Sequence, residues 1–234
     1  STSIQTGALV YQATFDSSDW SGDLVAYPVQ FDGLVGAASW NAASKLPGRH
    51  IGIGALTPAA RSIFTFDGSN AAIFSWHNLS AAQQTVLNTL GGIQDGHGQA
   101  RVDWLRGVQS QEVVEVGGVV TSGIFRRRDS VLGDIINSDP AFAHRDDFGY
   151  ANMGGGATEA ASYQAYVNGK STRIPAVFVG ANDGMLHAFR ADAGDANSGV
   201  ELFAYVPYGV YNKLSKLTDP GYVHEYYVDG GPTV

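Results

Sequence analysis

The sequence predicts a mainly β fold with a small helical insertion, and three observations lead to this class. Apolar and polar residues alternate over many short runs separated by turn residues, which is the rhythm of a β-sandwich or a propeller. Glycine supplies 30 of 234 residues, well above its usual share of about 7%. Only 15% of the residues are charged, whereas 11% are aromatic. Together these features favour a turn-rich β protein displayed outside the cytoplasm.

The first element is a predicted hairpin. Residues 8–15 alternate in polarity, the acidic segment 16–19 turns the chain, and residues 24–29 form the returning strand. Three further short strands are predicted, at 49–53, 63–66 and 72–76.

A helical insertion is predicted near residues 80–106. Ser80 and Gln83 have the spacing of a capping box, in which each side chain bonds the other residue's backbone N–H. Val86, Leu87 and Leu90 form the apolar stripe of this helix, which Gly91 ends. A second short helix is predicted at 100–105, after a glycine-rich loop.

Strands resume after the insertion. The strongest hairpin signal is Asn182-Asp183-Gly184, which joins the apolar runs 175–181 and 185–189. A long loop is predicted at 143–172, and loops of that length are usually functional or mobile. The remaining predicted elements are strands at 113–120, 123–128, 131–137 and 199–206, and a short helix at 210–217. Residues 228–234 read as a strand, a turn and the start of another strand.

Composition excludes several classes of protein. The chain has no cysteine, which rules out disulfide scaffolds and thiol catalysis. A net charge of −8 argues against a nucleic-acid partner, which needs a concentrated basic surface. No apolar run approaches the roughly 18 residues of a transmembrane segment. Residues 1–5 lack the features of a signal peptide, so the chain is either cytoplasmic or a piece of a longer, processed protein. Residues 228–234, which are predicted to include the start of a further strand, favour the second alternative.

The sequence indicates no catalytic, cofactor-binding or metal-binding residue. His187 alternates with apolar neighbours and is predicted to be a packed, hydrogen-bonded imidazole. His224 and Glu225 could make a polar pocket, but a strand edge is the favoured interpretation. The six histidines show no metal-ligand spacing: His50, His77, His97, His144, His187 and His224.

Three charged or polar clusters are also assigned structural roles. Asp16, Asp19 and Asp23 are interpreted as turn formers rather than an acid–base pair. Residues 192–199 faintly resemble a calcium loop, but a solvated hairpin turn is favoured. The basic run 126–128 is interpreted as an edge or interdomain contact, with its first and third arginines on one face.

Two short motifs are also interpreted as structural. Ser80 forms part of a glycosylation sequon with Asn78, and its N-cap role is the favoured explanation. Residues 169–171 match the end of a P-loop motif. A P-loop is followed by a helix, whereas the segment after these residues is predicted to be a strand.

Residues 175–189 resemble the propeller repeat of quinoproteins, in which a strand ends at glycine, turns through Asn-Asp-Gly and returns to an Ala-Phe pair. Taken with motifs elsewhere in order along the chain, they resemble the C-terminal domain of the PilC/PilY family of bacterial type IV pilus biogenesis proteins. The other motifs lie at 7–13, 20–24, 74–76, 102–107, 132–140, 201–207 and 224–230.

The resemblance implies that residues 1–234 are part of one C-terminal domain with a quinoprotein-like modified β-propeller fold. It also implies a non-enzymatic, exported protein at the cell surface or pilus tip, outer-membrane associated or periplasmic in transit. Such a protein supports pilus assembly, opposes retraction, and contributes to surface adhesion and twitching motility. Minor pilins are the implied partners, with host or abiotic surfaces as further targets.

Three departures from the family pattern matter. Arg190 stands where the repeat usually has Asp, and the turn after it is lengthened. The family's Asp-rich calcium loop is missing, so calcium is implied for the full domain and for no residue here. Propeller blades take about 40–50 residues each, so 234 residues cannot close seven blades. The propeller is therefore expected to be incomplete and the chain a fragment.

Two alternative functions stay open at this point. Fold kinship allows a quinone-dependent dehydrogenase, although kinship of fold is weak evidence of function. A carbohydrate-binding propeller, or lectin, is the other alternative, because exposed tryptophans can stack on sugars. Core packing is the favoured interpretation of the four tryptophans, Trp20, Trp40, Trp76 and Trp104.

Overall fold

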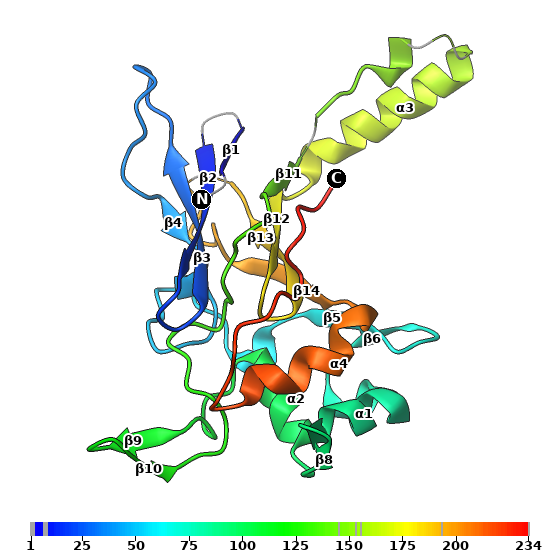
Figure 1. Ribbon diagram of the computed structural model, residues 1–234. Coiled ribbons are helices and arrows are strands. Elements are labelled where there is room, and N and C mark those ends of the chain that lie inside the picture. The colour runs from blue at the N-terminus through cyan, green and yellow to red at the C-terminus, as the bar shows by residue number, and fades with distance from the viewer. Residues whose placement is uncertain are drawn as a thin grey trace.

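The computed structural model describes residues 3–6, 9–144, 146–152, 154, 156–192 and 194–233. Two β-sheets face each other, helices cover one end of the larger sheet, and a helical arm projects from the other end (Figure 1). The smaller sheet has the strand order β1-β2-β3-β4. Its strands are β1 (Ser3–Thr6), β2 (Leu9–Asp16), β3 (Ser21–Pro28) and β4 (Trp40–Asn41).

The larger sheet has six strands in the order β11-β12-β13-β14-β5-β6. The β14–β5 pair is parallel and the other pairs are antiparallel, so segments far apart in the chain complete one sheet. Its strands are β5 (Ile63–Phe66), β6 (Ala71–Ile73), β11 (Ala141–Ala143), β12 (Ala176–Ala181), β13 (Met185–Arg190) and β14 (Glu201–Val206).

The predicted hairpins at residues 8–29 and 175–189 are confirmed. Strands β2 and β3 pair from Leu9–Pro28 to Asp16–Ser21, and alternate residues of each strand are buried. Strands β12 and β13 pair on either side of the turn at 182–184, where Gly184 has a φ of 91°. A positive φ is accessible to glycine at little cost, which explains this residue in the turn.

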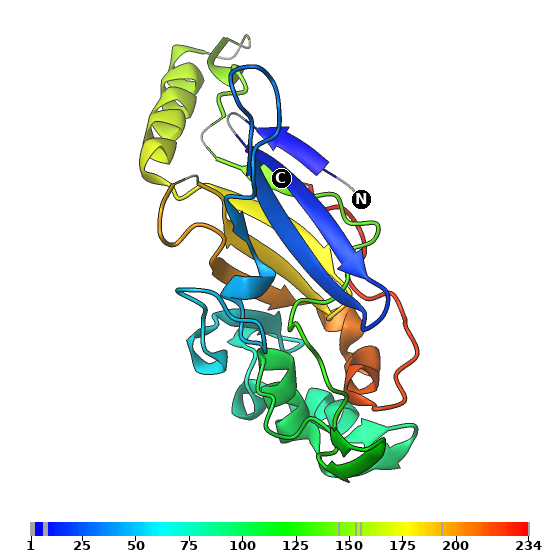
Figure 2. The same ribbon diagram turned by 90° about the vertical axis from the view of Figure 1, so that its left-hand side faces the viewer.

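One face of the larger sheet is buried under two separate apolar cores. The smaller sheet covers the β12–β13 half of this face (Figure 2), and its buried side chains meet those of β12 and β13. The helices cover the β5–β14 half. The first core contains Leu9, Tyr11, Ala13, Leu24, Trp40, Val177, Val179 and Phe189 among others. The second contains Ile63, Phe74, Leu87, Val102, Trp104, Met185, Val206, Tyr211 and Leu214 among others.

The helical insertion begins with the predicted capping box. The Ser80 hydroxyl accepts from the Gln83 backbone N–H, and the Gln83 side chain accepts from the Ser80 backbone N–H. Helix α1 (Ala81–Leu87) packs against α2 (Gly98–Arg106) and α4 (Tyr211–Leu214). The glycine-rich segment between α1 and α2, predicted as a loop, forms a small hairpin of β7 (Thr89–Leu90) and β8 (Ile93–Gln94).

The run predicted as one interrupted strand at 113–120 is a two-stranded hairpin, β9 (Val114–Val116) and β10 (Val119–Ser122). Gly117 and Gly118, both with positive φ, form its turn. This hairpin extends from the helical end of the molecule (Figure 1).

Several predicted strands are wrong. Segments 49–53, 123–128 and 131–137 form no strand ladder, and the contacts near them are single bridges such as Gly48–Ser130 and Ser21–Gly133. Their backbones bond to several different elements in turn, so no one neighbour supplies a ladder. The segment 228–233 also contains no strand.

The segment 143–172 is not a loop throughout. It contains α3 (Ala157–Gly169) and short 3-10 turns at Tyr150–Asn152 and Lys170–Thr172. Within the described ranges, no helix is long and apolar enough to cross a membrane.

Candidate functional site

The described residues between β11 and β12, here called the arm, project from the body of the molecule (Figures 1 and 2). Helix α3, which forms most of the arm, contains no buried residue. Its first turn is closed by Glu159, whose carboxylate accepts from the Gly156 backbone N–H. Because helices in proteins gain most of their stability from packing, α3 is held by contacts other than burial in an apolar core.

Aromatic rings hold the arm together. The ring of Tyr150 lies 6.1 Å from that of Phe148 and 5.3 Å from that of Tyr163, measured between centroids. Tyr163 lies 6.2 Å from Tyr166, and its hydroxyl accepts from the Phe148 backbone N–H. Phe148, Tyr150 and Tyr166 are nevertheless 64%, 57% and 49% exposed. The rings therefore stabilise the arm while presenting an aromatic surface.

Two cations flank this aromatic surface. The Lys170 ammonium lies 4.7 Å from the centroid of the Tyr166 ring, and the Arg173 guanidinium lies 5.1 Å from the same centroid. The Lys170 ammonium also donates to the Asp146 carbonyl, which fixes the base of the arm. A cation above an aromatic face strengthens the ring arrangement. Lys170 and Arg173 thus stand beside the aromatic rings in an arm that also carries the acidic residues Asp146, Asp147 and Glu159.

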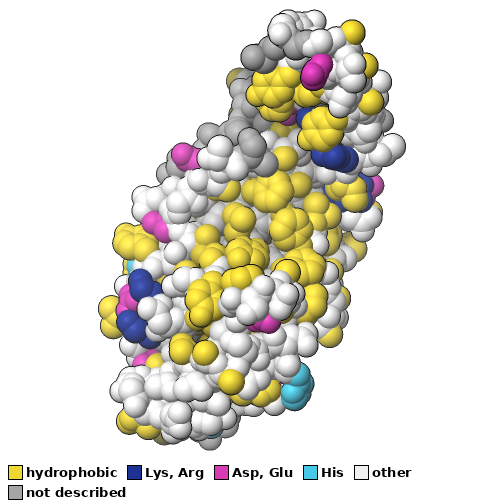
Figure 3. Space-filling view, turned by 90° about the vertical axis from the view of Figure 1, so that its right-hand side faces the viewer, with side chains coloured by type: hydrophobic (Ala, Val, Ile, Leu, Met, Phe, Trp, Pro, Cys, Tyr) yellow, Lys and Arg dark blue, Asp and Glu magenta, His cyan; other side chains and the backbone are white. Residues whose placement is uncertain are grey.

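The outer face of the six-stranded sheet is also aromatic. The Phe203 ring lies 6.1 Å from Phe178 and 6.2 Å from Phe64, so rings from β12, β14 and β5 form one aromatic row that crosses over β13. In Figure 3, hydrophobic side chains gather over this side of the molecule and again on the arm, with Lys and Arg side chains beside the latter.

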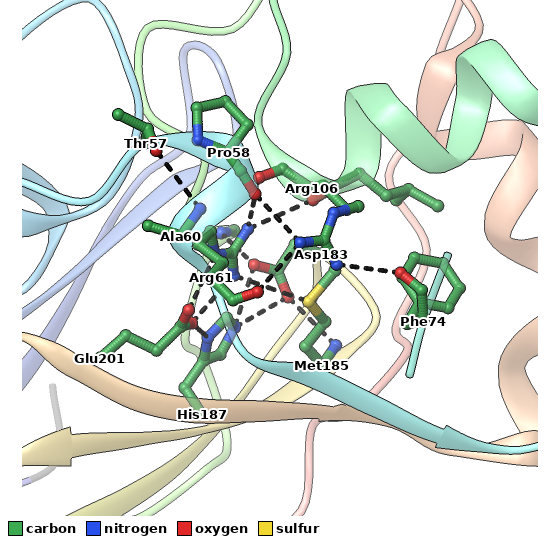
Figure 4. A network of polar contacts seen from close by, with 12 residues as sticks. Thr57, Pro58, Ala60, Arg61, Phe74, Arg106, Asp183, Met185, His187 and Glu201 are labelled. Carbon is green, nitrogen blue, oxygen red and sulfur yellow. Dashed lines mark hydrogen bonds and ion pairs between the residues drawn. The ribbon is translucent and has the colours of Figure 1, made fainter. Parts of the chain in front are cut away.

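The most extensive polar network is buried on the opposite face of the sheet (Figure 4). The Arg61 guanidinium donates two hydrogen bonds of 2.8 Å to the Glu201 carboxylate. The same carboxylate lies 2.8 Å from His187 Nδ1, and His187 Nε2 lies 3.1 Å from Asp183 Oδ2. The side chains of Arg61, Glu201 and His187 are fully buried. The prediction of a packed, hydrogen-bonded His187 is confirmed.

This network lies at the boundary between the two apolar cores. On β13, His187 stands between Met185 of the second core and Phe189 of the first. Arg61 also donates to the carbonyl of Leu105 at the end of α2. Arg106 donates to the backbone carbonyls of Phe74, Pro58 and Arg61. The network therefore joins the helical end to the sheet.

The charges in the network stabilise one another. Burial alone disfavours a charged imidazole, but the nearby carboxylates of Asp183 and Glu201 outweigh it and raise the pKa of His187 to about 9. Burial likewise disfavours the Glu201 carboxylate, but Arg61 and His187 lower its pKa to about 2. Because Arg61, His187 and Glu201 are fully buried and paired, this network, here called the clamp, can hold the sheet and the helical end together.

His224 contributes to a second polar cluster instead of the predicted strand edge. Its Nε2 lies 2.8 Å from Asp134 Oδ2, and its ring stacks on Trp20 at a centroid distance of 3.8 Å. Asn182 also donates to the Asp134 carboxylate and accepts from the Tyr227 backbone N–H. Burial raises the pKa of Asp134 despite these partners. The cluster ties the C-terminal segment to the turn after β12.

The acidic residues singled out from the sequence have structural partners. Asp16 and Asp19 accept from backbone N–H groups two residues further on, as expected of turn formers. Asp23 accepts from the Ala43 backbone and the Asn41 side chain. These bonds match the turn-former interpretation for Asp16 and Asp19, whereas Asp23, within strand β3, joins that strand to the segment after β4.

The turn after β13 does not fit a calcium ion. Asp192 and Asp195 both accept from the Arg190 guanidinium, so their oxygens already face a cation. Within the part of the chain that the structure describes, no group of three or more His, Asp or Glu residues is placed to hold a metal ion.

The basic run 126–128 alternates as predicted. Arg126 donates to the carbonyls of Leu217 and Asp19, and Arg128 pairs with Glu112 at 3.0 Å while its guanidinium lies 3.3 Å from the Trp104 ring centroid. Arg127 points outward and is largely exposed. The first and third arginines therefore join segments of this chain, which differs from the edge or interdomain contact favoured from the sequence.

Among the described residues the sheets do not close into a ring, and β11 and β6 are the edge strands of the larger sheet, which is consistent with an incomplete β-propeller. Residues 132–234 match the family model described as the PilY1 beta-propeller domain. The chain is a segment of a PilY1-family protein. No solved structure gives a significant match.

Curated relatives extend the match over nearly the whole chain. It is 37% identical to type IV pilus biogenesis factor PilY1 of Pseudomonas aeruginosa strain PAK, over 96% of this chain and 18% of that protein. It is 36% identical to a PilY1 homolog of Xylella fastidiosa strain Temecula1, over 97% of this chain and 16% of the relative. The chain thus spans less than a fifth of the length of these relatives, and the assignment of all 234 residues to one domain stays a prediction.

Sequence reasoning missed the arm helix and the partners of His187. The arm helix is rich in alanine, a strong helix former, and that propensity was the available signal. Arg61 lies 140 residues from Glu201, and no local pattern indicates such a pair.

Proposed function

We propose that this chain is part of a non-enzymatic type IV pilus biogenesis factor, exported to the cell surface or pilus tip. The names of the curated relatives support a role in pilus biogenesis. In this proposal the protein promotes pilus assembly, opposes retraction, and contributes to adhesion and twitching motility. No cofactor takes part within residues 1–234, and the calcium implied for the full domain binds outside them.

The observation that carries the docking role is the arm. It projects from the body, its helix buries no residue, and its exposed rings are flanked by Lys170 and Arg173. Aromatic side chains supply large contact areas and are enriched among residues that dominate binding energy. We propose that the arm docks on minor pilins, with its aromatic rings at the centre of the contact and the exposed Arg173 at the rim.

A binding measurement with purified minor pilins of the source bacterium tests this docking role. Tyr150→Ala and Tyr166→Ala each remove an exposed ring of the arm, and we expect each to weaken binding about tenfold or more. Phe31→Ala is the matched control, because Phe31 is fully exposed far from the arm in sequence. Equal pilin affinity of the arm variants and the Phe31→Ala control would contradict the proposal.

A further inference from the structure

The outer face of the six-stranded sheet, which lies opposite the two apolar cores, is itself apolar on every strand. The strand registers place on this face Phe178, Leu186, Phe203, Tyr205, Phe64 and Ile73, among others. Within the described strands of this sheet, the one charged residue in an outward position is Arg190, at the end of β13, and it pairs with Asp192. Strands that are apolar on both faces are typical of sheets covered on both sides.

The smaller sheet provides an internal comparison. The outward positions of β2 and β3 include Gln12, Thr14 and Asp23, whereas the inward positions are buried. This alternation is typical of an antiparallel sheet with one covered face and one face open to water. Of these two sheets, the larger one therefore has the composition of a sheet that is covered on its outer face as well.

Nothing in this chain covers most of that outer face. Phe64, Phe66 and Ile73 are 40%, 38% and 44% exposed, and the neighbouring Tyr208 is 51% exposed. Figure 3 shows hydrophobic side chains gathered over this side of the molecule. A contiguous apolar patch on a protein surface marks a contact surface.

The C-terminal segment already lies on one part of the outer face. Val179 and Ala181 point into the first core, so a Cβ at Gly180 would stand on the opposite, outer side of β12. This Cβ would lie 2.4 Å from the carbonyl oxygen of Val228. Asn137 donates to the Asp229 carboxylate from its backbone and its side chain, which holds the segment there. The last described residues therefore lead along this face (Figure 1).

The occupant that these observations favour is another sheet of the same protein. The chain spans less than a fifth of the length of its curated relatives, so most of such a protein lies outside these residues. Within the chain, the two sheets already pack face to face through the first core. Propellers repeat this stacking of sheets around a central channel.

We propose that a further β-sheet of the same protein, from outside these 234 residues, packs face to face on the outer face of the larger sheet. The row formed by Phe178, Phe203 and Phe64 lies at the centre of this contact. The side chains that face the row are apolar, because a charge buried against it would have no partner. The contact concerns the packing of the protein itself and does not depend on pilin docking by the arm.

Hydroxyl-radical footprinting of the purified full-length protein tests the proposal at a concentration where the protein is monomeric and without pilins. We expect Phe64 to be oxidised at least about fivefold more slowly in the folded protein than in the unfolded protein, because close packing excludes solvent. An uncovered face, on which Phe64 is 40% exposed, gives a smaller slowing, and that result would overturn the proposal. Slowing that appears only at higher protein concentration, or only after minor pilins are added, would assign the face to a second copy or to pilins and would also overturn it.

Two isoleucine variants of the full-length protein probe the contact from its edge. Ile73 lies directly across from Phe64 in the β5–β6 pair, whereas Ile93 is an exposed residue of β8 at the helical end. We expect Ile73→Lys to raise the oxidation rate of Phe64 at least about twofold and Ile93→Lys to leave it unchanged, because the first lysine would be buried under the covering sheet. Equal Phe64 rates in the two variants would contradict the contact. Phe189, buried in the first core, reports whether each variant is folded, and the wild-type measurement decides the proposal alone if a variant loses this protection.

Discussion

At the scale of residues, the buried clamp shows how charge is tolerated inside this fold. Arg61, His187 and Glu201 are fully buried and yet hold one another in charged form. Breaking such a buried group costs about 3–5 kcal/mol, because the partner is left uncompensated. The clamp therefore stabilises the boundary between the two cores, and a change in the protonation state of its groups changes the free energy of unfolding.

His187 makes the stability of the fold depend on pH in a defined window. Its pKa rises from 6.5 to about 9 on folding. Its contribution is therefore fully present below about pH 6.5 and is lost as the pH rises through about 9. A shift of this size corresponds to about 3 kcal/mol as an order of magnitude.

Chemical denaturation of the wild type and His187→Gln between pH 6 and pH 10 measures this contribution. We expect the unfolding free energy of the wild type to fall more steeply than that of the variant over this range. Parallel pH profiles of the two proteins would show that His187 is not held in its charged form.

The clamp was only partly predictable from sequence. The alternation around His187 indicates a buried imidazole, because its neighbours on β13 are apolar. Its partners depend on strand pairing: β14 brings Glu201 alongside β13, and β5 follows directly after Arg61. That parallel β14–β5 contact joins segments separated by the whole helical insertion, so no local pattern reveals it.

At the scale of elements, the arm helix differs from the other helices in what stabilises it. Helices α1 and α2 bury Leu87, Val102 and Leu105 in the second core. Helix α3 buries none of its residues and contacts the turn at Tyr150–Asn152 instead. Without an apolar stripe its sequence gives no helical periodicity, and this is why the segment 143–172 was predicted as a loop.

Removing Tyr163 tests whether the aromatic rings maintain α3. The Tyr163 ring contacts Tyr150 and Tyr166, and its hydroxyl accepts from the Phe148 backbone. We expect Tyr163→Ala to raise the hydrogen-exchange rates of the α3 amides about fivefold or more while leaving those of β12 and β13 unchanged. Tyr208→Ala, at an exposed ring beside β5, is the control. Unchanged α3 exchange in Tyr163→Ala would show that other contacts hold the arm.

At the scale of the whole molecule, the hairpins β2–β3 and β12–β13 were predicted correctly, whereas the hairpins β7–β8 and β9–β10 and the segments that bridge distant elements were not. The turn at Asn182-Asp183-Gly184 is local, so its sequence suffices. Residues 123–137 look like strands because they contain short runs of apolar and β-branched residues, yet their backbone N–H and C=O groups bond to separate partners, including Thr218 and Trp20. Their conformation is set by tertiary contacts.

The larger sheet has two free edges and an aromatic outer face. Strands β11 and β6 each have one neighbour, and Phe64 and Phe66 on the outer face are 40% and 38% exposed. Closed propellers remove free edges by pairing or covering them. This geometry agrees with the family match, in which the chain is one segment of a larger propeller-containing protein.

We propose that this protein supports pilus assembly through its arm, and the amount of surface pili on the source bacterium tests this role. The chromosomal gene is changed to encode Tyr150→Ala and Tyr166→Ala together, and sheared surface pilin is measured in retraction-competent and retraction-deficient strains. We expect surface pili to be lost in the first strain and to return in the second. Wild-type amounts of surface pili in the retraction-competent strain, with the variant protein present at its normal level, would contradict it.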